Sequence, residues 1–273
     1  MGKLITAVAC LILWCAPLHA SNTPADLWDF WATHNDANPD RIDHGAWDEL
    51  LSHYVVTNHE SGINRFRYGD LSKADRSKLD DYIERLSNLD PRVFSNNEQL
   101  AYWLNLYNAL TVRQIAEHYP VKDLRDISFG RFSRHDFWSV EATKVVRQSI
   151  SLGDIEHRIL RPIWKDHRVR FGIACGALSC PNLQPSAFTG ETVRAELYAA
   201  AREYINHTRG VQLENGQLTV SSLFDWYRDD FAPDDKTLVK LFAHYKDDLS
   251  ALYLLGFNGD IKYNYNWTLN SAE

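Results

Sequence analysis

Residues 95–120 read SNNEQLAYWLNLYNALTVRQIAEHYP, and this stretch predicts the longest helix of the chain. Ser95 and Glu98 form a capping-box pattern, and Pro120 ends the run. One helical stripe carries Leu100, Leu104, Tyr107, Thr111 and Ile115. We therefore expect a helix from Asn96 to Tyr119 at the centre of the core.

Two amides lie on the flank of this helix, Asn105 and Asn108, three residues apart. An unpaired buried polar group costs about 1–3 kcal/mol, so these side chains need partners. They either bond neighbouring backbone or face a cleft. In the second case Asn105 and Tyr107 are candidate substrate-binding residues, and Asn108 could orient a catalytic side chain.

Residues outside this helix predict a single mixed α+β domain, rich in helix, with a small sheet and a C-terminal β-hairpin. Helices are expected at 25–34 and 44–55, anchored by Trp28, Trp31, Trp47 and Leu51, and then at 72–89, 189–206, 222–231 and 236–245. Ser151 and Asp154 predict the start of another short helix. Strands are expected at 140–150 and 169–175, in a hairpin around Asn215-Gly216, and at 261–269, where an extended tail is the alternative.

The first 20 residues resemble a secretory signal peptide. Lys3 precedes an apolar stretch from Leu4 to Leu18, and Ala20 offers a small residue for cleavage. The predicted organisation is a signal peptide at 1–20, a helical lead-in at 21–68 and the main domain at 69–273. We expect the mature protein to be exported, periplasmic or secreted, without stable membrane insertion.

Composition restricts the partners. The chain has 45% hydrophobic and 24% charged residues, as globular proteins do, and a formal net charge of −7. No basic run interrupts this acidic background, which argues against nucleic acid as a partner. We expect an envelope ligand or protein instead; the sequence does not indicate the oligomeric state.

Two cysteines remain after the leader, in the segment Cys175-Gly176-Ala177-Leu178-Ser179-Cys180-Pro181, which is expected to follow a strand. In an oxidising compartment the pair predicts a disulfide that staples the loop. Alternatively, Cys175 or Cys180 is a nucleophile. The base would be His157, oriented by Glu156 or by Asn108.

Other chemistry has less support in the sequence. The His and Cys spacings match no metal site, and no Gly-rich phosphate loop is visible, so no metal and no cofactor are expected. The aromatic residues suggest a competing function, because exported proteins that bind glycans use aromatic faces for sugar rings. Most of the Trp residues have core spacing. Trp138 lies in a polar stretch, and it is the Trp residue that we expect in a cleft, as a candidate for substrate binding.

Five ordered motifs resemble the bacterial family called domain of unknown function 547. They are residues 101–110 (AYWLNLYNAL), 151–157 (SLGDIEH), 175–181 (CGALSCP), 221–231 (SSLFDWYRDDF) and 261–270 (IKYNYNWTLN). The resemblance implies that the helix with Asn105 and Asn108, the Glu156-His157 helix and the two-cysteine loop belong to one recurring arrangement. It implies no activity. Where this chain has Arg170, the family often has His.

Two functions follow as expectations. The first is a thiol-dependent hydrolase or acyl-transfer enzyme that acts on a peptide, an amide or an envelope polymer, with Cys175 or Cys180 as nucleophile and His157 as base. The second is a binding or interaction domain without catalysis. In that domain a disulfide between Cys175 and Cys180 shapes an aromatic cleft for a glycan or a protein.

Overall fold

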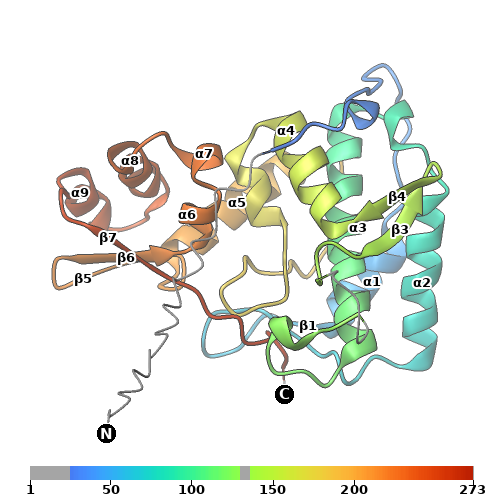
Figure 1. The fold of residues 1–273 in the computed structure, drawn as a ribbon, viewed down its shortest axis with the longest axis horizontal. Helices are drawn as coiled ribbons and strands as arrows, with labels where there is room; N and C mark the ends of the chain where they lie inside the picture. Colours follow the sequence, from blue (N-terminus) through green and yellow to red (C-terminus); the bar gives the residue numbers. More distant parts are fainter. Residues whose placement is uncertain (1–24, 130–135, 273) are drawn as a thin grey trace, which may run out of the picture.

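The structure is a computed structural model that describes residues 25–129 and 136–272 (Figure 1). It confirms a mixed α+β fold in which helices predominate and the sheets are small. The α-helices are α1 (Gly45–Tyr54), α2 (Lys73–Ser87), α3 (Asn96–His118), α4 (Arg161–Trp164), α5 (Val193–Asn206), α6 (Leu223–Trp226), α7 (Arg228–Phe231), α8 (Asp235–Tyr245) and α9 (Ser250–Leu255). The strands are β1 (Val55–Val56), β2 (Arg65–Phe66), β3 (Glu141–Val145), β4 (Gln148–Ser151), β5 (Val211–Glu214), β6 (Gln217–Ser221) and β7 (Ile261–Asn264). Shorter helical segments are η1 (Asp29–Trp31), η2 (Pro91–Val93), η3 (Leu124–Asp126), η4 (Asp154–Leu160) and η5 (His167–Gly172).

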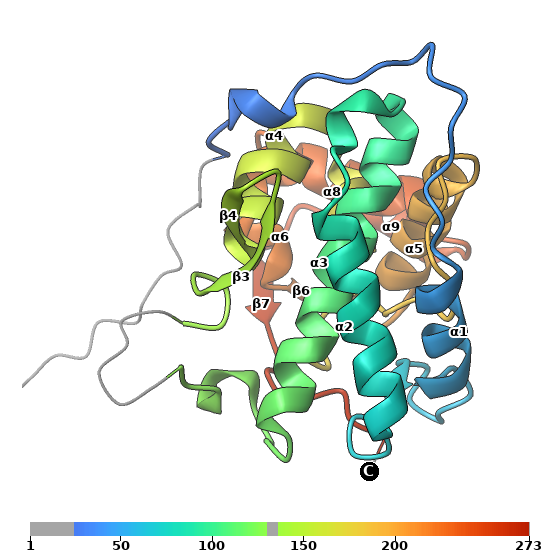
Figure 2. The same ribbon diagram turned by 90° about the vertical axis from the view of Figure 1, so that its right-hand side faces the viewer.

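Helix α3 is the central element of the larger core. Its start is as the sequence predicts, because the Ser95 side chain accepts a hydrogen bond from the Glu98 backbone N–H. The helix is buried on all sides over most of its length, beyond the single stripe that the pattern predicts. Helix α2 lies beside it, and α1 packs on α2 (Figure 2).

The predicted helix at 25–34 is wrong: only the 3₁₀ turn η1 forms there. The segment instead runs beside η4, where the backbone N–H groups of Asp26 and Trp28 donate to the carbonyls of His157 and Arg158. These backbone groups are therefore bonded to another element rather than to their own turn. Trp31 is fully buried as expected, whereas Trp28 is half-buried.

The predicted single strand at 140–150 is a hairpin of two strands, β3 and β4. Its turn lies at Val146 and Arg147, which have φ values of 47° and 64°. Left-handed backbone is uncommon for such residues, and a β-branched residue is the rarest choice. No Gly or Asn marks the turn, so the sequence carries no signal for it.

The predicted strand at 169–175 is also wrong. Residues 167–172 form the 3₁₀ helix η5, and the chain then continues without a strand partner. Asn108 takes the place of a neighbouring strand, because its side chain donates to the Gly172 carbonyl and accepts from the Ala174 N–H. The apolar run is buried by packing, and short apolar runs do not distinguish a strand from a buried helical segment.

The C-terminal part forms the other end of the molecule (Figure 1), with its own core and a three-stranded sheet in the order β5-β6-β7. The hairpin β5–β6 is confirmed, with Asn215 and Gly216 both at positive φ in its turn. Helix 222–231 is broken at Tyr227 into α6 and α7, and α9 was not predicted. Strand β7 pairs parallel with β6 and is shorter than expected.

After β7 the chain continues as an extended tail, residues 265–272, back to the larger core (Figure 1). Bridges join Thr268 to Asp123 and Leu269 to Ala177, and Ser271 lies beside Phe66. The tail therefore connects the two ends of the molecule and crosses the two-cysteine loop. The predicted signal peptide lies outside the described residues. Within 25–129 and 136–272, no helix has the length and apolar character needed to cross a bilayer.

Candidate functional site

The residues Glu156 and His157 lie on η4, which is a π-helix rather than an α-helix. Its start is fixed as the capping pattern predicts. The Ser151 hydroxyl accepts from the Asp154 N–H at 3.0 Å, and the Asp154 carboxylate accepts from the Ser151 N–H at 3.0 Å. Short π-helical segments are rare and occur often at functional sites.

Glu156 forms a buried ion pair with Arg170 of η5. The side chains are 2% and 7% exposed, so water does not separate the charges. The Arg170 guanidinium carbon also lies 4.0 Å from the ring centroid of Tyr227. Burial favours the neutral form of Glu156, but Arg170 and His157 outweigh it and hold the pKa of this carboxyl below its usual value. The pair is therefore ionised at neutral pH.

His157 packs between charged groups and an aromatic ring. Its Nδ1 lies 3.1 Å from Arg161 Nη1 and 3.8 Å from Glu156 Oε1, and its ring stacks on Tyr227. Burial lowers the pKa of His157, Glu156 raises it, and Arg170 and Arg161 lower it further, with a net decrease. A neutral imidazole is the dominant form at pH 7, and Arg161 is itself held by Asp230 at 2.5 Å.

The two cysteines form a disulfide, with their Cα atoms 5.7 Å apart. Gly176 has a φ of +90°, and a Cβ there would lie 2.5 Å from Ile115 of α3. The position therefore requires glycine for both backbone conformation and space. The tail secures the loop: Leu178 N–H donates to the Thr268 carbonyl at 2.8 Å, and Asn270 N–H donates to the Gly176 carbonyl at 2.8 Å.

Aromatic side chains from three separate segments meet beside this loop. Trp226 of α6 stacks on Trp267 of the tail with ring centroids 5.4 Å apart and planes at 22°. Tyr265 lies 4.6 Å from each of these two rings. Trp138 contacts the edge of Trp267 at 5.7 Å. Each of the four side chains is half-buried, so part of each remains accessible.

These groups enclose a cleft of about 510 Å³, which we call the aromatic cleft. It is lined by Asp136, Trp138, Glu156, His157, Arg170, Cys175, Trp226, Tyr227, Tyr265 and Trp267. The volume lies within the range of small-molecule binding sites, which are mostly apolar with a few placed polar groups. In this cleft the aromatic rings form the walls, and the Glu156–Arg170 pair and His157 supply the polar groups.

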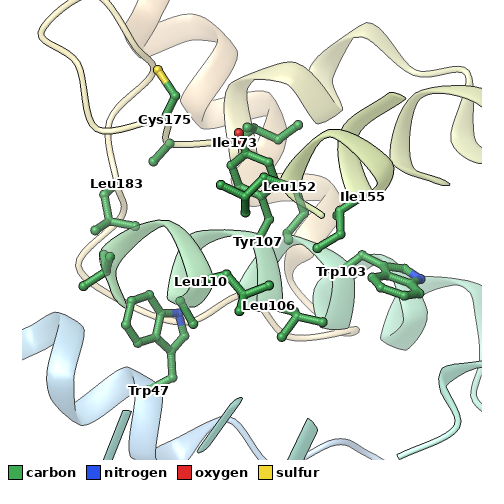
Figure 3. Close-up of a cluster of buried hydrophobic side chains, with 14 of the residues drawn as sticks. Trp47, Trp103, Leu106, Tyr107, Leu110, Leu152, Ile155, Ile173, Cys175 and Leu183 are labelled. Carbon is green, nitrogen blue, oxygen red and sulfur yellow. The ribbon is translucent and has the colours of Figure 1, made fainter. Parts of the chain in front are cut away.

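The structure brings four of the predicted site residues together in the aromatic cleft: Trp138, Glu156, His157 and Cys175. Cys180 lies directly behind, joined to Cys175. Tyr107 is fully buried, and Figure 3 shows it within the core beside Leu152 and Ile173. It packs under the cleft rather than lining it.

The two asparagines of α3 are not part of the cleft lining. Asn105 donates to the Phe188 carbonyl at 2.8 Å and accepts from the Phe188 N–H at 3.0 Å. Asn108 bonds Gly172 and Ala174 in the same way. The sequence allowed these amides either to bond neighbouring backbone or to face a cleft. Both side chains bond buried backbone groups, and neither orients His157.

Six lining residues were not predicted as site residues: Asp136, Arg170, Trp226, Tyr227, Tyr265 and Trp267. Four of them lie in the two C-terminal motifs, residues 221–231 and 261–270, so the signal that could have found them was present. The alternation of aromatic residues at 263, 265 and 267 is a further signal, because every second residue of an extended segment faces the same side.

Within the described ranges, no three His, Cys, Asp or Glu side chains gather closely enough to hold a metal ion. Comparison with known proteins adds a family but no activity. No curated protein and no solved structure matches the chain. Residues 91–205 match the family model described as "Protein of unknown function, DUF547", a match that supports the DUF547 family for this chain.

Proposed function

We propose that this protein is an exported binding domain, without catalysis of its own at this site, that holds a saccharide ring of an envelope glycan in the aromatic cleft. The observation that carries the proposal is the convergence of three Trp and two Tyr side chains on one cleft whose lining includes a buried ion pair. The disulfide is consistent with the oxidising compartment that the leader sequence predicts.

The chemistry of the lining matches a sugar ring. A pyranose presents C–H groups on its faces and hydroxyl groups around its edge. The faces suit Trp226 and Trp267, while the edge needs donors and acceptors such as those of Glu156 and His157.

A thiol-dependent hydrolase fits the geometry less well. Its nucleophile must be a free thiolate, whereas both sulfurs are joined in the disulfide. The amide that could have oriented the base, Asn108, is bonded to backbone on both sides. A cleft that retains a ligand without transforming it requires neither group.

The test is calorimetric titration of the mature protein with soluble oligosaccharide fragments of cell-wall peptidoglycan and with neutral β-linked oligosaccharides. We expect saturable binding, and Trp226→Ala should weaken it at least about tenfold, because the variant removes a desolvated aromatic contact. Tyr253→Ala is the matched control, since Tyr253 is an exposed aromatic residue on α9, 72% accessible. Equal affinity in Trp226→Ala, or no binding to any fragment, would overturn the proposal. Hydrolysis of the fragments during the titration would overturn its non-catalytic part.

A further inference from the structure

The disulfide presents its two sulfurs differently to the aromatic cleft. Among the described residues that line the cleft, Cys175 is present and Cys180 is absent. Figure 3 shows the Cys175 sulfur directed away from the core side chains that pack on α3. Cys175 is therefore the cysteine of the pair that a small molecule in the aromatic cleft can contact.

Two hydrogen-bond donors lie beside the second sulfur, and one of them, the Ala177 N–H, contacts Cys180 but not Cys175. The Ala177 N–H donates to Cys180 Sγ at 3.4 Å, and the Tyr265 hydroxyl lies 3.2 Å from Cys180 Sγ and 3.4 Å from Cys175 Sγ. Burial raises the pKa of Tyr265 well above its usual value, so this hydroxyl keeps its proton and serves as a donor. Donors of this kind stabilise a thiolate, and a sulfur that is stabilised as a thiolate is a better leaving group.

We propose that the Cys175–Cys180 disulfide is a site of thiol–disulfide exchange, attacked at the Cys175 sulfur by a low-molecular-weight thiol that enters the aromatic cleft. This activity goes beyond saccharide binding and does not require it, although both use the same cleft. The access of Cys175 and the donors at Cys180 together define the direction of attack.

The exchange proceeds in two balanced steps. The incoming thiolate forms a bond to Cys175 Sγ, the bond between the two protein sulfurs breaks, and its electron pair passes to Cys180 Sγ. The Ala177 N–H and the Tyr265 O–H stabilise the resulting thiolate. A second thiolate then attacks the external sulfur of the mixed disulfide and releases Cys175. Two small thiols are oxidised to a disulfide, and the protein disulfide is reduced to a dithiol.

The first measurement is the rate of reduction of the folded, oxidised protein by 2-mercaptoethanol and by glutathione. The reaction is quenched with acid and alkylated, and the products are counted by intact mass. Direct attack in the cleft predicts a rate that rises linearly with thiol concentration. A rate that reaches a plateau would overturn the proposal, since it would show that the disulfide reacts only after the protein opens.

Two tyrosine variants test the leaving group without removing a sulfur. Tyr265→Phe loses the hydroxyl beside Cys180 and should be reduced about tenfold more slowly, as expected for one hydrogen bond to a charged group. Tyr253→Phe is the matched control and should react at the wild-type rate, because Tyr253 is exposed on α9. Wild-type reduction rates in Tyr265→Phe would contradict the assigned donor.

Single cysteine variants identify the attacked sulfur. With oxidised glutathione, Cys180→Ser should form a mixed disulfide at Cys175 at least about tenfold faster than Cys175→Ser forms one at Cys180, because only Cys175 lines the cleft. Near-ultraviolet circular dichroism confirms that each variant is folded. Equal rates, or a faster reaction at Cys180, would overturn the direction of attack.

Discussion

The Tyr265 hydroxyl lies 3.2 Å from the sulfur of Cys180, although 85 residues separate the two in sequence. This contact joins the C-terminal tail to the disulfide loop. Backbone hydrogen bonds from Leu178 to Thr268 and from Asn270 to Gly176 reinforce it. One wall of the aromatic cleft and the disulfide therefore form a single structural unit, so a change in the structure of either should alter the other.

Replacing either cysteine removes the disulfide and should lower the free energy of unfolding by the same amount. Cys175→Ser and Cys180→Ser should each reduce the free energy of unfolding by about 2 kcal/mol, the value expected for so short a closed loop. Urea unfolding measures it, and the fully reduced wild-type protein should match both variants. Loss of stability in only one variant would show that the removed side chain, rather than the cross-link, is responsible.

The buried ion pair predicts a larger effect. Glu156→Gln leaves the Arg170 charge buried without its partner and should destabilise the protein by about 3–5 kcal/mol. The matched control is Glu60→Gln at an exposed position, which should change stability by less than about 0.5 kcal/mol. Replacing both partners, as Glu156→Met with Arg170→Leu, should cost less than the single change. A double variant at least as unstable as Glu156→Gln would contradict this account.

Asn108 should matter for stability through the backbone that it satisfies. Asn108→Ala leaves the Gly172 carbonyl and the Ala174 N–H without their partner and should cost about 2–4 kcal/mol. Asn258→Ala, at an exposed position, is the control and should be near neutral in thermal unfolding. Below the unfolding temperature, ligand binding by Asn108→Ala should be unchanged. Lost affinity in a folded Asn108→Ala protein would instead place this amide in the site.

Lowering the pH should destabilise the protein through its buried histidines. Burial, with Arg85 nearby, lowers the pKa of His44 from 6.5 to about 4, so between these values the unfolded chain binds a proton that the native state does not. The contribution of His44 to the free energy of unfolding is therefore fully present above pH 6.5. It falls as the pH approaches 4, and the loss is about 2–3 kcal/mol at pH 4.5. His157 contributes with the same sign.

Urea unfolding at pH 7.5 and at pH 4.5 measures this difference. His44→Gln should show a smaller loss between the two pH values than the wild type, because its side chain does not titrate. His244→Gln, at an exposed position, should keep the full loss. An undiminished pH dependence in His44→Gln would show that other groups cause the acid sensitivity.

The elements that the sequence predicted correctly are those with local signals. Helix α3 has its cap at Ser95, and the β5–β6 turn has Asn215 and Gly216, so a few neighbouring residues determine each. The capping pair of Ser151 and Asp154 was also correct, although the helix that it starts is a π-helix. That distinction depends on packing around the turn and not on the capping residues.

Two of the wrong elements, at 25–34 and 169–175, depended on partners far away in sequence. The run before Cys175 has the composition of a strand, but its backbone groups are bonded by the Asn108 side chain, 66 residues earlier. Likewise Tyr265 and Trp267 reach the cleft only because the tail returns across the loop. The alternation at 263, 265 and 267 indicates one face of an extended segment but not which cleft that face reaches. The η4 residues, the loop residues and Trp138 could therefore be predicted as site residues, whereas the aromatic residues of the C-terminal part could not be placed beside them.

Saccharide binding in the aromatic cleft can be observed in an NMR titration of the indole N–H resonances with soluble peptidoglycan fragments. A saccharide ring in the cleft should shift the resonances of Trp138, Trp226 and Trp267 until they saturate. Those of the buried core residues Trp31, Trp47 and Trp103 should stay in place in the same sample. Shifts confined to other Trp residues, or none at saturating fragment, would contradict saccharide binding in the cleft.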